Sequence, residues 1–262
     1  MKVYTTQPFQ VIYSLFEHEY LGYLFESFVV QINTKGQLTL QHQNISAKNA
    51  DEFSARLDAK DFKLIVLIDQ IQQDAVLKKF SNKKLSPVDF FLKVYDPEKG
   101  DKNMQEAIHH YIQVRMNKIL ELLQDRRTFI IGKDGDPTWK EIKVATEKAS
   151  VRFHLHRNED NTHYYPTVRY KGEKLNFQYR NAVLICYEPA WLMVDGVIHS
   201  FENGVDGKKL QPFLNKKFIL VPRSVEENYY RKFVTSLVES FDVRPNGFEI
   251  KPQQFRPKPH LN

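Results

Sequence analysis

The sequence predicts an α+β protein, because helical and alternating hydrophobic periods occupy different parts of the chain. Residues 1–127 combine short runs of aromatic and β-branched residues with segments whose apolar residues recur at helical spacing. Residues 128–250 alternate between apolar and polar side chains, with turn signals at KDGDP, Lys171-Gly172, Asp195-Gly196 and Asn246-Gly247. We therefore expect a small N-terminal sheet plus helices, followed by a curved antiparallel β-meander with two helices.

The first half is expected to open with strands and to continue with helices. PFQVIYSLF and YLFESFVVQI predict two strands, and NTKG before QLTLQ predicts a hairpin turn. Asn49, with Glu52 three residues later, and Asp58 are expected helix N-caps, and Ser86 precedes a proline at the first helical position. Between residues 101 and 125 the apolar spacing predicts one long amphipathic helix, carried by Met104, Ile108, Tyr111, Ile112, Ile119 and Leu123.

Two helices and a tail are expected within or after the meander. KKLQPFL predicts a short helix, and Ser224 with Glu227 is expected to form a capping box before an apolar stripe of Tyr229, Phe233, Leu237 and Phe241. The segment KPQQFRPKPHLN has three prolines and no hydrophobic period, which is typical of a linker. The expected organisation is thus a helix-rich subdomain at 1–127, a sheet-rich subdomain at 128–250 and a Pro-rich tail at 251–262.

Composition favours a folded protein without a membrane segment. The chain of 262 residues is 42% hydrophobic and 13% aromatic, enough for a sizeable core. Its longest aliphatic run, LIVLI, is too short to cross a bilayer, and the N-terminus lacks the apolar core of a signal peptide. The single cysteine, Cys186, lies in the apolar run AVLIC and is expected to be a small buried hydrophobe. We therefore expect a cytoplasmic protein with no membrane partner.

The positive charge is concentrated in the second half of the chain. The formal net charge is +6 and the pI is about 9.1. Residues 1–127 hold 17 basic and 16 acidic side chains, whereas residues 128–262 hold 21 and 16. This bias permits an anionic partner such as nucleic acid without requiring one.

The stretch SVRFHLHRNEDNTHYYPTVRYKGEKLNFQYRN carries the most suggestive pattern. Alternation along a strand separates Val151, Phe153 and Leu155 from the polar side chains between them. Two further strands are expected to divide in the same way, the third running through residues 175–180. One face of the meander would then be basic, and its candidate nucleic-acid-binding residues are Arg152, His154, His156, Tyr165, Arg169, Lys171, Gln178 and Arg180.

This basic face has three interpretations. It could be the solvated side of an antiparallel sheet, which is polar in any case. It could also be a phosphate-tracking surface, since fixed cations flanked by an aromatic ring and amides suit nucleic acid. A metal site is the third and weakest interpretation, because His154 and His156 would need His163 or Asp160 to fold back as a further ligand. We therefore expect neither a metal nor another cofactor.

Enzymatic signatures are missing from the sequence. It has no phosphate loop, no Gly-x-Ser-x-Gly elbow, and no metal-binding motif of the Cys-x-x-Cys or His-Glu-x-x-His kind. The only cysteine lies in an expected core strand, which leaves nucleophilic catalysis without a candidate. We predict that the chain itself is not an enzyme.

Several segments resemble a known family: YLGYLFESFVVQ, HQNISAKNADEF, DFKLIVLIDQIQQD, RNEDNTHYYPTVRYKGEKLNFQYRN, EPAW and VDGKKLQPFLNKKFILVPRSVEENYYRKFV. Together they are similar to the accessory region that precedes the motor in bacterial, Bacteroides-type helicases of the Swi/Snf family. The resemblance covers residues 1–250. Members of that family are DNA-dependent ATPases that translocate on duplex DNA, often with a zinc-binding SWIM module before this region.

The resemblance implies a module rather than a motor. The chain lacks the phosphate loop, the Asp-Glu-x-His box and the SWIM cysteines of the family, so no family functional residue can be assigned here. The expected function is a non-catalytic accessory module that contacts DNA or positions it for a helicase motor in the same or a partner polypeptide. The alternative is a protein-interaction or autoinhibitory domain that docks on the motor.

Overall fold

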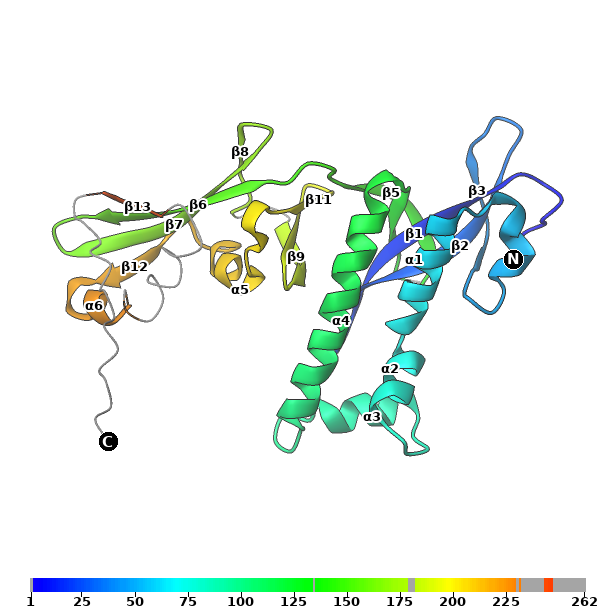
Figure 1. Cartoon of the computed structure of the whole chain (residues 1–262), viewed down its shortest axis with the longest axis horizontal. Helices are drawn as coiled ribbons and strands as arrows, with labels where there is room; N and C mark the ends of the chain where they lie inside the picture. Colours follow the sequence, from blue (N-terminus) through cyan, green and yellow to red (C-terminus); the bar gives the residue numbers. More distant parts are fainter. Residues whose placement is uncertain (1, 134, 179–181, 230, 232–242, 247–262) are drawn as a thin grey trace, which may run out of the picture.

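The computed structural model describes residues 2–133, 135–178, 182–229, 231 and 243–246, and it confirms the α+β class. Figure 1 shows β6 (Ser150–Arg157), β7 (Asn161–Tyr170), β12 (Ile219–Pro222) and β13 (Val243–Asn246) at one end of the molecule. At the other end lie β1 (Phe9–His18), β2 (Gly22–Ile32) and β3 (Leu38–Asn44) with α1 (Ala59–Gln70). The principal helices are α1 (Ala59–Gln70), α2 (Gln73–Phe80), α3 (Pro87–Val94), α4 (Lys102–Leu122), α5 (Gly207–Leu210) and α6 (Glu226–Tyr229). Within the described residues, none of the helices has the length and apolar character needed to cross a membrane.

Eight strands form one mixed sheet in the order β3-β2-β1-β4-β5-β11-β10-β9. The predicted strands and the hairpin turn of the first half are confirmed. β4 pairs parallel with β1, and β11 pairs parallel with β5, while the other neighbours are antiparallel. The strands of this sheet are β1 (Phe9–His18), β2 (Gly22–Ile32), β3 (Leu38–Asn44), β4 (Thr128–Ile131), β5 (Pro137–Val144), β9 (Ala182–Tyr187), β10 (Ala190–Val194) and β11 (Val197–Ser200).

The sheet crosses the boundary that we predict after residue 127. Tyr13 of β1 faces Thr128 of β4 in the parallel register, and the Tyr13 amide donates to the Arg127 carbonyl at 3.2 Å. Residues on both sides of the boundary also share one hydrophobic cluster, in which α1 and α4 pack with residues of β1, β2, β5, β9, β10 and β11. Strands from both predicted subdomains are therefore hydrogen-bonded in one sheet.

Most of the predicted helix starts are confirmed. Asp58 accepts from the backbone of Asp61 in a capping box, and Ser86 caps α3 ahead of its proline. The long helix is α4, capped by Asp101. Asn49 occupies the predicted N-cap position, but the helix that follows is a 3-10 helix, Ala50–Arg56. The Asn49 side chain makes no capping hydrogen bond to that helix and accepts from the amide of Ser46 instead.

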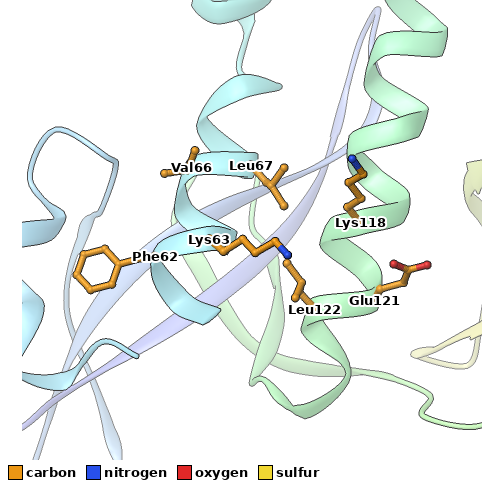
Figure 2. Close-up of a pocket in the computed structure, with 7 residues that line it drawn as sticks. All are labelled: Phe62, Lys63, Val66, Leu67, Lys118, Glu121 and Leu122. Atoms are coloured by element: carbon orange, nitrogen blue, oxygen red, sulfur yellow. The ribbon is translucent and has the colours of Figure 1, made fainter. Parts of the chain in front are cut away.

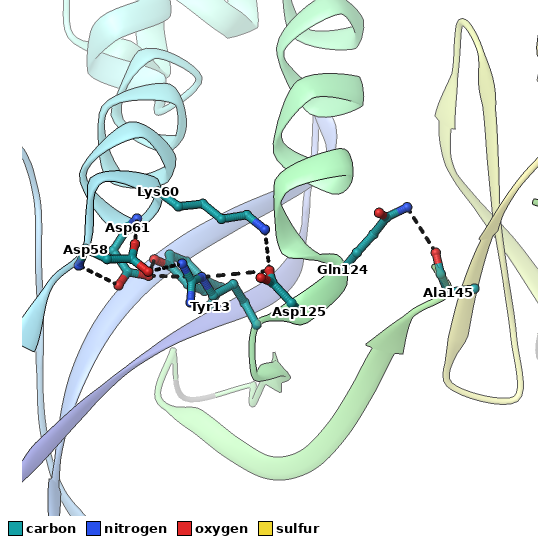
Figure 3. Close-up of polar contacts among 8 residues, drawn as sticks. Tyr13, Asp58, Lys60, Asp61, Gln124, Asp125 and Ala145 are labelled. Atoms are coloured by element: carbon teal, nitrogen blue, oxygen red, sulfur yellow. Dashed lines mark hydrogen bonds and ion pairs between the residues drawn. The ribbon is translucent and has the colours of Figure 1, made fainter. Parts of the chain in front are cut away.

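A polar network joins the first turn of α1 to β1 and to the chain after α4 (Figure 3). The hydroxyl of buried Tyr13 donates to Asp61 at 2.7 Å, and burial together with this carboxylate raises the pKa of Tyr13. Arg126 reaches Asp58 at 2.5 Å and Asp61 at 3.3 Å. An ion pair at the surface, Lys60 with Asp125, completes the network.

The hairpins from β9 to β11 are enclosed between two cores. Ile185, Trp191 and Ile198 belong to the cluster under α4. Leu184 and Leu192 belong to a second cluster that contains the apolar face of β6 and β7. Cys186 is fully buried, as we predict, and burial raises the pKa of its thiol to about 12.

The second sheet differs from the meander that the sequence predicts. Its order is β12-β7-β6-β13, and β8 also pairs with β7. β13 lies parallel to β6, so this sheet is not purely antiparallel, and β4 and β5 belong to the first sheet instead. Its strands are β6 (Ser150–Arg157), β7 (Asn161–Tyr170), β8 (Glu173–Leu175), β12 (Ile219–Pro222) and β13 (Val243–Asn246).

The two predicted helices of the second half are present where the structure describes them. KKLQPFL contributes to α5 and to the 3-10 turn Gln211–Phe213 that follows it. Ser224 does not cap α6, because it lies inside the 3-10 turn Arg223–Val225 and α6 begins at Glu226. The stripe beyond Tyr229 and the tail at 251–262 lie outside the described residues.

Candidate nucleic-acid interface

The hairpin of β6 and β7 separates polar from apolar side chains as the sequence predicts. Phe153 faces Pro166, and Leu155 faces Tyr164, in the antiparallel register. These four side chains are buried. Because side chains alternate along a strand, the residues between them lie on the opposite face. We call this opposite face the β6–β7 polar face; it contains Ser150, Arg152, His154, His156, His163, Tyr165, Thr167 and Arg169.

Two rows of rings cross the polar face. His154 faces Tyr165, and their rings are stacked with centroids 4.9 Å apart and planes 17° apart. His156 faces His163 in the next row. Aromatic cross-strand pairs of this kind stabilise a sheet and hold the rings in a defined orientation. The structure thus brings together three candidates that the sequence places on this face, namely His154, His156 and Tyr165.

Cations occupy the other end of the polar face. Arg152 is half-buried opposite Thr167, and exposed Arg169 lies opposite Ser150. Arg169 Nη1 donates to the carbonyl of Gly172 at 2.9 Å, which holds the guanidinium beside the turn and leaves most of its N–H donors for other acceptors. On the far side of β7, exposed Lys174 faces Arg169.

Lys171 does not belong to the strand alternation that we predict for it. Lys171 and Gly172 form the turn between β7 and β8, with φ values of 51° and 82°. Two consecutive residues of positive φ are typical of a two-residue hairpin. The ammonium of Lys171 pairs with Glu147 at 3.0 Å, so its charge is partly compensated. Pairing with this carboxylate raises the pKa of Lys171.

The third predicted strand is displaced in the structure. β8 ends at Leu175, so half-buried Gln178 lies after the strand, and Arg180 lies outside the described residues. The hairpin turn could have revealed the true register, because a two-residue turn pairs Tyr170 with Glu173 and Arg169 with Lys174. Lys174 is therefore the cation that the sequence analysis missed.

The sequence analysis also missed the contribution of β12, which pairs with the N-terminal half of β7. Leu220 faces His163 across this pair, and the ring of Phe218 stacks on His163 with centroids 4.4 Å apart and planes 7° apart. Phe218 is 40% exposed and Leu220 is 51% exposed. No local pattern reveals this pairing, because paired residues such as Tyr164 and Ile219 are 55 positions apart in the chain.

A partly buried ion pair holds α6 against the end of the β6–β7 hairpin. Arg157 Nε and Nη2 donate to the two carboxylate oxygens of Glu226 at 3.1 and 2.6 Å. The hydroxyl of buried Thr162 donates to Glu226 at 2.5 Å. This bidentate contact fixes the position of α6 relative to the polar face.

The described residues contain no group of three or more His, Cys, Asp or Glu side chains that could hold a metal ion. His156 and His163 face each other, but the ring of His154 is stacked on Tyr165 in the neighbouring row. The site therefore presents cations and rings rather than a ligand set.

A separate apolar groove lies between α1 and α4 (Figure 2). Its volume is about 610 Å³. Apolar side chains line it together with Lys63 of α1 and Lys118 of α4, and Val66 is 44% exposed there. The remaining lining residues are Phe62, Leu67, Glu121 and Leu122.

Comparisons of this chain with protein-family models, with curated proteins and with solved structures find no match.

Proposed function

We propose that this chain is a non-catalytic accessory module of a Swi/Snf-type DNA translocase and that it contacts DNA through the β6–β7 polar face. The observation that carries this proposal is the grouping of Arg152, Arg169 and Lys174 on adjacent positions of one sheet face. The resemblance of residues 1–250 to the accessory region of these helicases supports the same assignment. A cytoplasmic location and a motor in the same or a partner polypeptide belong to the proposal.

The chemistry of the polar face suits a phosphate backbone. Guanidinium and ammonium groups on adjacent strands can follow successive phosphates, and neutralising phosphates releases condensed counterions. Main-chain pairing fixes the strands that carry these cations, so their backbone loses little conformational freedom on binding. The described face offers no arrangement for reading individual base pairs, and we therefore expect weak binding without sequence preference.

Salt-dependent binding tests the proposal. Fluorescence anisotropy with a labelled 20-base-pair duplex should give an affinity that falls steeply between about 50 and 200 mM salt. The double variant Arg169→Ala/Lys174→Ala should weaken binding and reduce the slope of log K against log salt by about one to two, since each residue neutralises at most one phosphate.

The matched control removes the same charge elsewhere. Lys83 and Lys84 are exposed in the connection between α2 and α3. Lys83→Ala/Lys84→Ala should leave the slope unchanged. Equal losses in the two double variants would mean that net charge alone drives binding, and absence of binding at low salt would refute the DNA proposal.

The groove between α1 and α4 favours a second candidate function, docking on the helicase motor. A groove lined by apolar side chains, two lysines and one glutamate suits an amphipathic segment of a protein partner. Under this alternative, Val66→Glu should abolish association with a purified motor in calorimetry, while Arg169→Ala/Lys174→Ala should leave it unchanged.

A further inference from the structure

Exposed rings and cations lie together where β12 joins the polar face. Phe218 and Leu220 are among the large apolar side chains that remain exposed, and exposed Lys216 and Lys217 directly precede Phe218. The DNA contact proposed above uses the opposite end of the face, around Arg169 and Lys174. The β12 end therefore has no role in that proposal.

The geometry of the rings indicates what could bind there. His163 and Phe218 are nearly parallel at 4.4 Å, so each ring covers one face of the other. Since Phe218 is still 40% exposed, part of the surface that His163 does not cover is accessible to solvent. A further planar ring placed there would extend an existing stack, which is the arrangement by which proteins bind unpaired bases.

The surroundings of the stack suit a single strand of nucleic acid. Lys216 and Lys217 lie beside the ring in the chain, where they can contact the phosphates that flank a stacked base. The His154–Tyr165 pair continues the line of rings along the polar face towards Arg152. In a duplex the base faces are covered by neighbouring pairs, so only unpaired bases can use these rings.

We infer that Phe218, supported by His163, is a stacking site for an unpaired base of single-stranded DNA at the β12 end of the polar face. This inference rests on the proposed DNA contact and adds a preference for single strands. The cations along the face bind phosphates of either form, whereas the ring distinguishes single strands from duplex.

The test compares three labelled probes with the full chain in anisotropy titrations at low salt. The probes are a 20-nucleotide oligo-dT strand, the same strand with abasic sites throughout, and a 20-base-pair duplex. Phe218→Ala should weaken binding of oligo-dT about 5- to 150-fold, the range for loss of one base–aromatic stack, and should leave duplex binding within twofold. The abasic strand should bind the unaltered chain about as weakly as oligo-dT binds Phe218→Ala.

Two further variants complete the test. Phe218→Trp should retain the preference for oligo-dT, because it keeps a stacking ring. Leu92→Ala is the matched control, since Leu92 is also an exposed apolar side chain but lies on α3. It should change binding of no probe, and circular dichroism should show that Phe218→Ala remains folded.

The outcomes separate this inference from the proposed function. If Phe218→Ala binds oligo-dT normally, or loses duplex and oligo-dT equally, the stacking site is refuted while a salt-dependent DNA contact still stands. If the abasic strand binds as well as oligo-dT, phosphates alone are recognised and the inference fails. If no probe binds at low salt, both proposals fail.

Discussion

Replacing Arg157 by methionine should destabilise the protein by about 3 to 4 kcal/mol, because the carboxylate of Glu226 would stay buried without its cation. The side chain of Glu226 is 7% exposed and accepts two hydrogen bonds from Arg157, whose side chain is 28% exposed. Methionine keeps most of the aliphatic stem, so the loss reports the guanidinium contact rather than a cavity. The partial exposure of Arg157 places the expected cost towards the lower end of the 3–5 kcal/mol range for buried pairs.

A double-mutant cycle with Glu226→Gln makes the reasoning specific. In the unaltered chain this change should cost about 1–2 kcal/mol, because a neutral amide accepts weaker hydrogen bonds than a carboxylate. In the Arg157→Met background the same change should stabilise the protein by about 1–2 kcal/mol, because an amide is less costly to bury than an unpaired charge. The sign of the Glu226→Gln effect should therefore reverse between the two backgrounds.

Urea unfolding followed by circular dichroism measures the four free energies of the cycle. Glu227→Gln is the control, since Glu227 is 92% exposed and pairs with Arg231 at 3.6 Å in an exposed ion pair. It should change stability by less than about 0.5 kcal/mol. If Glu226→Gln destabilises both backgrounds equally, the carboxylate is hydrated in the folded state and the argument is refuted.

Three further predictions follow from the cores and the network of Figure 3. The backbone amide of Asp61 lowers the pKa of Asp58, and Lys60 lowers that of Asp125. Both carboxylates therefore stabilise the folded protein above about pH 4, and this stabilisation is lost as pH falls through the lowered pKa values. In Asp125→Asn the urea midpoint should fall less steeply with acid pH, and an unchanged dependence on pH would contradict this. Cys186, with a pKa raised to about 12, should react with thiol reagents at pH 8 only as fast as the protein opens, and rapid stoichiometric labelling would contradict its burial. Gly207→Ala should lower the free energy of unfolding by about 1–3 kcal/mol, because a Cβ at this position would lie 3.0 Å from the Cα of Tyr187. An unchanged melting temperature would show that this contact relaxes freely.

Local patterns in the sequence were sufficient for many of the elements. The caps Asp58 and Ser86 act within one helical turn, and the alternation in β6 and β7 is set by the pleat, so both can be predicted from neighbouring residues. The same local rule placed Arg152, His154, Tyr165 and Arg169 on one face. Hairpin chemistry at Lys171-Gly172 also acts locally, and the error there came from starting the third strand two residues too late.

Sheet order and the partners of individual charges depended on tertiary structure. β4 pairs parallel with β1 across more than 100 residues, which joins the two predicted halves in one sheet. Lys171 pairs with Glu147, which lies between β5 and β6, and Arg157 pairs with Glu226, the first residue of α6. Strand periodicity specifies which face a side chain occupies, but not which strand lies beside it.

The composition of the candidate site shows the same distinction. The sequence determined that β6 and β7 have a polar face with cations and rings, because that follows from alternation alone. Only the tertiary structure decided that Lys174 lies beside Arg169, that Lys171 pairs with Glu147, and that Phe218 stacks on His163. These contacts depend on the register of the strands and on the pairing of β12 with β7. Packing of the buried faces sets both features over long sequence separations, and no pattern between neighbouring residues specifies them.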